Sequence, residues 1–191
     1  MKVNNKSKTI YSKKQIDKIN KKINLLGVNS KYNAITLLNV RLFGAIFIFL
    51  FILINYKYGY IFSIIIALLY YVLFEKVILE NKISKRRKKL NIEAIYFFEV
   101  LTLSLQTGRN LNEAISITIN SVDNDLSLEF REALRETKFG KSLTESLTDM
   151  QDRIPSDSIN NIVLALTQAN IYGSSIIDTM HSQIDYLRQR R

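Results

Sequence analysis

The chain has 191 residues, of which 47% are hydrophobic, and it carries 27 Lys and Arg against 17 Asp and Glu, a formal net charge of +10. It contains no cysteine, which excludes disulfides, thiol catalysis and cysteine-ligated metal sites. The one histidine, His181, has no second histidine with which to hold a metal, and a place on a helix surface is expected for it. Because no motif predicts catalysis, we expect no catalytic residue, no metal and no cofactor, and a protein that is not an enzyme.

Residues 1–33 form a basic segment. From Lys13 to Leu26, apolar residues recur at helical spacing among lysines, which favours an amphipathic helix lying on a membrane surface. These apolar residues are Ile16, Ile19, Ile23 and Leu26. A partly disordered basic tail explains the same composition equally well, so both interpretations stay open.

Two uncharged apolar runs follow, at residues 42–54 and 59–74. Each run is shorter than the roughly 20 residues that a membrane-spanning helix needs. Flanking apolar residues extend the first run if Arg41 reaches the membrane surface with its charged end. We therefore predict two transmembrane helices, at about 36–55 and 59–79. The alternative, a buried core of a soluble protein, is disfavoured because soluble helices of this length normally have a polar face.

The distribution of positive charge predicts the orientation of this hairpin, which occupies residues 34–80. Ten Lys and Arg residues lie before residue 42, a basic run at 85–89 follows the second span, and the connecting loop holds only Lys57. Since cytoplasmic flanks carry the excess of Lys and Arg, we expect both ends of the hairpin in the cytoplasm and the loop outside. The expected location is the cytoplasmic (inner) membrane, as a multi-pass protein with its C-terminal domain in the cytoplasm.

A basic juxtamembrane linker is expected at residues 81–90. Its five consecutive cations are interpreted as lipid-facing, since cations beside a membrane span contact anionic headgroups. They are Lys85, Arg86, Arg87, Lys88 and Lys89. Residues 91–191, by contrast, hold nine cations and fourteen acids, a net charge of −5. A nucleic-acid-binding protein would carry its cations on the folded domain, so we expect membrane lipids as partners and no nucleic acid.

Residues 91–191 contain a six-residue pattern, Gly-x-[Asn/Ser]-[Leu/Ile]-x-[Glu/Asp], three times, at intervals of 32 and 33 residues. Glycine closes a helix in the left-handed conformation, the Asn or Ser caps the next helix, and the acid three positions later completes a capping box. Each copy is therefore predicted to be a tight corner between two helices. The corner residues are Gly108, Asn110 and Glu113; Gly140, Ser142 and Glu145; and Gly173, Ser175 and Asp178.

Three corners at this spacing predict three helix-Gly-helix hairpins in series, so the fold class is all-α, a transmembrane hairpin followed by a cytoplasmic six-helix domain. Apolar residues at spacings of three and four give each predicted helix one buried face. In chain order, the faces are Phe97, Phe98, Leu101 and Leu105; Leu111, Ala114, Ile115 and Ile119; Leu126, Phe130 and Leu134, with Phe139 as a further candidate; Leu143, Leu147 and Met150; Ile159, Ile162, Val163, Leu166 and Ala169; and Ile176, Ile177, Met180, Ile184 and Leu187.

The first three of these helices also carry an acidic surface. In the third helix the acids alternate with Arg131 and Arg135, a pattern typical of a solvated face. Our hypothesis is that this surface binds a partner, because it would attract a basic face on another protein. Its residues are Glu113, Asp123, Asp125, Glu129, Glu132 and Glu136.

The three corners lie in the segments 103–115, 138–147 and 168–176, after a membrane hairpin and a basic stretch. Together these features resemble the type II secretion system F domain family, and within it the tight-adherence (Tad) pilus platform proteins TadC and TadB. The resemblance implies an inner-membrane platform protein that couples a cytoplasmic assembly ATPase to pilin assembly.

The partners that the resemblance implies are the assembly ATPase, pilin subunits, and a second platform protein or further copies of the chain. It also implies further membrane helices beyond the equivalent of Arg191. A membrane-anchored helical adaptor or scaffold outside any secretion system is the alternative function.

Overall fold

A computed structural model describes residues 11–55, 59–172 and 176–189. Within these ranges the regular secondary structure is helical and no strand occurs, which confirms the all-α prediction there. The chain divides into two compact units. We call residues 1–23 with 30–83 the hairpin unit, and residues 24–29 with 84–191 the helical domain.

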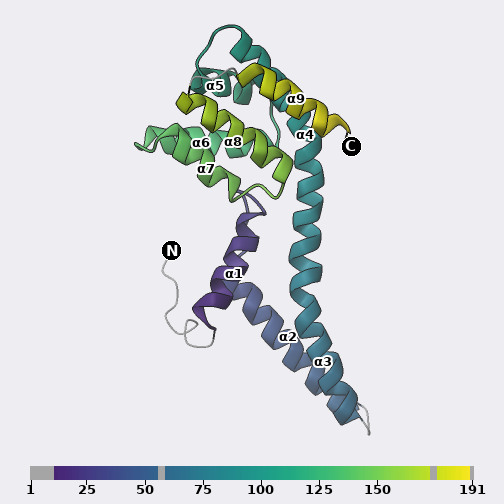
Figure 1. Ribbon diagram of the computed structural model, residues 1–191. Helices are drawn as coiled ribbons and strands as arrows, with labels where there is room; N and C mark the ends of the chain where they lie inside the picture. The colour runs from purple at the N-terminus through teal and green to yellow at the C-terminus, as the bar shows by residue number, and fades with distance from the viewer. Residues whose placement is uncertain (1–10, 56–58, 173–175, 190–191) are drawn as a thin grey trace. The chain divides into compact units, whose positions relative to one another are not determined.

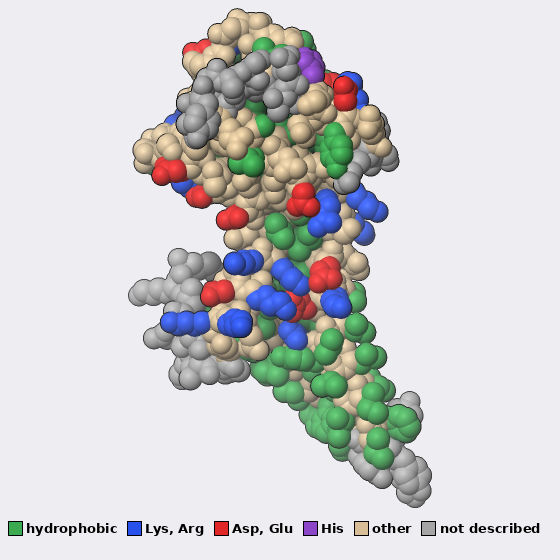
Figure 2. Space-filling model, viewed as in Figure 1, with side chains coloured by type: hydrophobic (Ala, Val, Ile, Leu, Met, Phe, Trp, Pro, Cys, Tyr) green, Lys and Arg blue, Asp and Glu red, His purple; other side chains and the backbone are tan. Residues whose placement is uncertain are grey.

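The hairpin unit is built on two apolar helices, α2 (Ala34–Asn55) and α3 (Gly59–Glu75), which lie side by side (Figure 1). Hydrophobic side chains cover the surface of this pair (Figure 2). Only 6% of the most apolar window of α2 is buried, so α2 does not have the environment of a soluble core helix. Its 22 residues span about 33 Å, which matches a hydrocarbon layer of ~30 Å. By length and composition the pair can cross a membrane.

A glycine of α2 faces a tyrosine of α3. A Cβ at Gly44 would lie 2.4 Å from the hydroxyl oxygen of Tyr70, so a larger residue there would require the Tyr70 side chain to move. Small residues at such crossings let membrane helices pack closely. After α3 the chain continues through a π-helical segment, η2 (Lys76–Glu80).

Arg41 of α2 contacts the neighbouring helix α3. Its Nε donates to the backbone oxygen of Tyr71 at 2.8 Å, and its Nη1 lies 3.4 Å from a carboxylate oxygen of Glu75. The guanidinium also stacks 3.7 Å from the centre of the Tyr71 ring. The Arg41 guanidinium therefore has polar and aromatic partners on α3.

The basic N-terminal segment forms a helix, α1 (Lys13–Asn24). Ile19 and Ile23 are buried, and Ile19 lines a small cavity with Leu37 of α2 and Phe74 of α3. Lys22 lies 2.8 Å from Glu75 at the end of α3. The apolar face of α1 therefore contacts the hairpin, and basic side chains lie over its outer surface in Figure 2.

In the helical domain, consecutive helices pack on one another from α5 to α9. The helices are α4 (Asn81–Gln106), α5 (Leu111–Ser121), α6 (Asp125–Lys138), α7 (Leu143–Gln151), α8 (Asp157–Tyr172) and α9 (Ile176–Gln189). The order α4 to α9 matches the six predicted helices. One difference is at the start, where residues 81–90, expected as a linker, are already helical and belong to α4.

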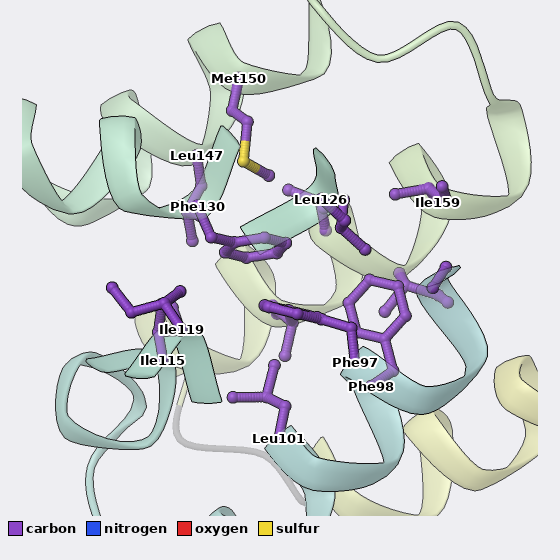
Figure 3. Close-up of a cluster of buried hydrophobic side chains, with 14 of the residues drawn as sticks. Phe97, Phe98, Leu101, Ile115, Ile119, Leu126, Phe130, Leu147, Met150 and Ile159 are labelled. Atoms are coloured by element: carbon purple, nitrogen blue, oxygen red, sulfur yellow. The ribbon is translucent and has the colours of Figure 1, made fainter. Parts of the chain in front are cut away.

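The core of the domain is centred on three phenylalanines (Figure 3). Phe97 of α4 stacks on Phe130 of α6 with ring centres 4.6 Å apart, and Phe98 meets the same ring edge-on at 6.2 Å. Leucine, isoleucine and methionine side chains from α4 to α9 complete the core. Phe139 was wrongly considered for this face: it lies at the C-terminal end of α6 and is 80% exposed. The side chains of Ala169 and Ile176 lie outside the described part of the chain.

The corner between α6 and α7 closes one helix and opens the next within four residues. Gly140 has φ +95°, and the amides of Gly140 and Lys141 donate back to Thr137 and Glu136, which is a Schellman motif. The Ser142 hydroxyl then accepts from the Glu145 amide while the Glu145 carboxylate accepts from the Ser142 amide. This reciprocal pair is a capping box. Hydrogen bonding by Ser142 also lowers the pKa of the Glu145 carboxyl.

The first corner is simpler. Gly108 has φ +79° and closes α4, and Asn110 accepts a hydrogen bond from the Glu113 amide at 2.9 Å as the N-cap of α5. Asn124 caps α6 in the same way at the intervening turn. The third predicted corner lies outside the described residues at Gly173 and Ser175, as does the side chain of Asp178.

A buried carboxylate joins four segments of the domain. Glu129 of α6 has 2% of its side chain exposed, and its oxygens lie 2.7 Å from Arg86 Nη2 and 3.0 Å from Arg153 Nε. The backbone amide of Val28 donates to the same carboxylate at 3.0 Å. Arg86 Nη1 donates further to the backbone oxygens of Leu25 and Arg153. We call Glu129, Arg86 and Arg153 the Glu129 cluster.

Gly27 is required beside the Glu129 cluster for two reasons. Its φ is +92°, a left-handed conformation that L side chains rarely adopt, and a Cβ there would lie 2.5 Å from Arg86 Nη2 and 2.7 Å from Glu129 Oε1. A side chain at this position would force the ion pair apart.

We expect Gly140→Val to lower the free energy of unfolding by about 1 to 3 kcal/mol, because valine resists the left-handed conformation. Nothing lies within 4 Å of a Cβ at Gly140, so Gly140→Asn, which tolerates that conformation, is the matched control and should lose less.

Ser142→Ala should lower the free energy of unfolding by about 1 kcal/mol at neutral pH. Because the folded Glu145 pKa is lowered, its part of the cap is lost as the pH falls through that pKa, so the Ser142→Ala deficit should shrink in acid. Thermal denaturation of the full chain in detergent, followed by circular dichroism, measures each; equal melting of the Val and Asn variants would contradict the backbone explanation.

We expect Glu129→Gln to destabilise the domain by about 3 kcal/mol, because it leaves the buried Arg86 and Arg153 without a counter-charge and turns an amide donor towards them. Glu132→Gln on the same helix removes only an exposed pair with Arg135 and should cost less than about 1 kcal/mol. The same denaturation experiment compares them. A Glu129→Gln variant as stable as Glu132→Gln would show that the cluster contributes little.

Candidate functional site

The predicted acidic surface is largely neutralised within the domain. Glu129 faces the interior rather than solvent, so its assignment to a partner surface is corrected: a buried carboxylate with three donors is not available to another protein. Of the others, Glu136 lies 2.6 Å from Lys141 and Asp125 lies 2.7 Å from Lys89.

Glu132 is held by Arg135 through two hydrogen bonds, of 2.7 and 2.5 Å. The hydrogen bonds from Arg135 lower the pKa of the Glu132 carboxyl. Glu113 and Asp123 are exposed, and neither carboxylate forms an ion pair with another described residue. Uncompensated negative charge on the predicted surface is therefore confined to Glu113 and Asp123.

Three of the five cations predicted to face lipid also contact the protein. Arg86 belongs to the Glu129 cluster, Arg87 Nε donates to the backbone oxygen of Pro155 at 2.5 Å, and Lys89 binds Asp125. Hydrogen bonding to Asp125 raises the pKa of Lys89. The physical reason is that successive residues of a helix point 100° apart, so five consecutive cations surround α4 and part of them face the domain. Lys85 and Lys88 are exposed.

An open groove lies between α5 and α6, with a volume of about 650 Å³. Its α5 wall is polar and comprises Asn112, Ser116 and Asn120, which are spaced by four residues and lie on one face of the helix. Its α6 wall is basic and comprises Arg131, Arg135 and Lys138, again on one face. The remaining lining residues are Glu113, Ile119, Leu134 and Thr137.

The charges of the groove differ in how they are held. Arg131 Nη2 donates to the backbone oxygen of Ile119 at 3.0 Å, which fixes this guanidinium across the groove. Arg135 forms an ion pair with Glu132, whereas Lys138 forms no ion pair among the described residues. Glu113 is the only acid of the lining, so the lining carries a net positive charge.

The described residues contain no group of three or more His, Asp or Glu that could hold a metal ion. His181 of α9 is exposed and has a ring nitrogen 3.3 Å from the Gln106 side chain.

The sequence analysis did not identify the groove, Gly27 or Arg153 as important. Arg131 and Arg135 were recognised only as interruptions of an acidic row. The helical spacing of Arg131, Arg135 and Lys138 predicts a basic face on this helix. Which helix lies opposite that face depends on how α5 packs against α6. No local signal pairs Arg86 with Glu129, which are 43 residues apart.

Comparison with known proteins agrees with this architecture. The family model described as Type II secretion system (T2SS), protein F, matches residues 97–191, which include the end of α4 and all of α5 to α9. No curated protein and no solved structure matches the chain significantly. Residues 97–191 are therefore similar to protein F of the type II secretion system, which, with the apolar hairpin, indicates a membrane platform protein of a secretion or pilus machine.

Proposed function

We propose that this chain is an inner-membrane platform protein of a Tad-type pilus or a related type II secretion-like machine, and that it couples a cytoplasmic assembly ATPase to pilin assembly. The similarity of residues 97–191 to protein F carries the proposal, because this family generally works with an assembly ATPase and other platform components. The role is mechanical rather than enzymatic: the helical domain binds partners and the hairpin anchors it.

The two units suit this division of work. The hairpin exposes its apolar side chains, as a membrane anchor does, whereas the helical domain has its own core and buries its phenylalanines. The Glu129 cluster further stiffens the domain, since it ties α4 and α6 to the 24–29 segment and to the connection that contains Arg153. A stiff domain transmits force from a bound motor better than a mobile one.

The orientation follows from the positive-inside rule, which places both flanks of the hairpin in the cytoplasm. Lys13, Lys14 and Lys21 of α1 are exposed, as are Lys85 and Lys88 of α4, and these are the cations that we propose for anionic lipid headgroups.

Because the chain has no cysteine, single-cysteine variants report on topology without background. We expect Asn55→Cys, at the end of α2, to react with a membrane-impermeant thiol reagent in intact cells. Ser121→Cys, at the exposed end of α5, should react only after the cells are opened. Labelling of Ser121→Cys in intact cells, with Asn55→Cys protected, would reverse the topology and remove the proposed contact with a cytoplasmic ATPase.

We expect the full chain in detergent to capture its cognate assembly ATPase. Asp123→Lys should weaken this binding roughly tenfold at low salt, about 1.4 kcal/mol, because it reverses an uncompensated charge of the acidic surface. The deficit should fall at high salt, since exposed charges are screened over about 10 Å at 0.1 M. Asp152→Lys, an exposed acid at the end of α7, is the control. If the Asp123 and Asp152 variants bind alike across a salt series, Asp123 is not at the interface; if the parent captures no ATPase, the coupling role itself fails.

A further inference from the structure

We propose that the groove between α5 and α6 binds an extended acidic segment of a partner protein, one with carboxylates at alternate residues. The proposal goes beyond the coupling role and does not depend on the partner being the assembly ATPase. It rests on the shape of the groove, the spacing of its cations and the polarity of its opposite wall.

The groove has the size of a short peptide. The 11 residues of α5 give it a length of about 16 Å, which corresponds to about five residues of extended chain. Its volume is about 650 Å³, and the backbone bond from Arg131 to Ile119 holds its two walls at a fixed separation at one end. A ligand therefore meets a site that exists before binding, which reduces the entropy cost of association.

The cations match an extended chain in their spacing. Arg131 and Arg135 are four residues apart, which is about 6 Å along α6. In an extended peptide, side chains on the same side are two residues apart, or about 6.7 Å. Carboxylates at alternate positions can therefore pair with Arg131 and Arg135, and the next one approaches Lys138. Arginine suits this role because one guanidinium has several donors. Arg135 holds Glu132 through Nε and Nη2, and its Nη1 remains to donate to a carboxylate of the ligand.

The opposite wall suits a peptide backbone. Asn112, Ser116 and Asn120 offer both donors and acceptors, as the amides of an extended chain require. Between the walls, Ile119 and Leu134 give the groove an apolar floor on which an aliphatic side chain of the ligand can rest. These two features distinguish a peptide groove from a simple patch of positive charge.

The same features argue against a nucleic acid. A long polyanion would also meet the fourteen acids of residues 91–191, and the exposed carboxylate of Glu113 lies in the lining of the groove. A short segment with two or three acids interacts with the cations and extends little beyond them.

The test uses the full chain in nanodiscs of zwitterionic lipid and a fluorescein-labelled peptide, Ala-Glu-Leu-Glu-Ala-Glu-Ala, with binding followed by fluorescence anisotropy. The Arg135→Gln/Lys138→Gln double variant should bind at least tenfold more weakly than the parent. Its matched control is Lys88→Gln/Arg109→Gln, which removes two exposed cations outside the groove. Ser116→Phe fills the groove without changing any charge and should weaken binding as much as the double variant.

Further measurements separate shape from charge. The same peptide with glutamine in place of every glutamate should not bind, and binding of the parent peptide should weaken as salt rises. Equal affinities for the two double variants, or unchanged binding by Ser116→Phe, would overturn the proposal. So would a single-stranded oligonucleotide that binds as tightly as the peptide and is lost in the same variants, because the groove would then be a general anion site. Circular dichroism of each variant verifies that the helices are intact. If the Arg135→Gln/Lys138→Gln variant is misfolded, peptide binding by Ser116→Phe tests the proposal instead.

Discussion

A carboxylate placed in a protein interior must be matched by donors, because burying an unpaired charge costs several kcal/mol. In the helical domain that constraint acts at Glu129. Its partners come from the start of α4, from the connection between α7 and α8 and from the 24–29 segment, so each of these has to lie where its donor reaches the carboxylate. Gly27 has no side chain because the ion pair occupies the space that a Cβ would need. The Glu129 cluster therefore connects these segments through polar contacts, in addition to the hydrophobic core.

The periodicity of α6 separates two uses of charge on one helix. Glu129 and Glu136 are seven residues apart and therefore lie on the same face of α6. The carboxylates of both lie close to Arg153. Arg131, Arg135 and Lys138 lie on another face and line the groove against α5. Glu129 and Glu136 of α6 therefore act inside the domain, whereas its cations line the groove. This distribution explains how a domain with equal numbers of acids and cations can present a basic groove.

In the hairpin unit, partly buried charges are likewise matched by partners of opposite charge. Arg41, Glu75 and Lys22 form a group at the end where α1 meets the two apolar helices, and each finds its partner on a different helix. The apolar face of α1 contacts the hairpin through Ile19. Its lysines remain on the outside, which agrees with a role at a membrane surface. The resulting anchor and the stiff helical domain fit the work proposed for a platform protein.

Local signals in the sequence determined most of the secondary structure. The Gly108 and Gly140 positions, with Asn110 and Ser142 after them, end and begin helices through bonds to their immediate neighbours, so the six helices of the domain can be predicted from the sequence alone. The apolar runs likewise predicted α2 and α3, because a helix of a soluble protein normally has a polar face and these runs have none. At the corners, the hydrogen-bonded residues are within six positions of each other in the chain, so a short sequence pattern predicts them directly.

The sequence could not determine which charges meet. Glu129 and Glu132 lie on the same helix, yet Glu129 is buried and Glu132 is only partly buried. The difference depends on which face of α6 packs against its neighbours. Arg86 resembles its basic neighbours, and only the fold brings it to Glu129, 43 residues away. The groove depends in the same way on how α5 packs against α6. The sequence by itself determined the helices and the corners at Gly108 and Gly140, which depend on local hydrogen bonds. Tertiary structure decided the ion pairs and the groove, which depend on contacts between residues far apart in the chain.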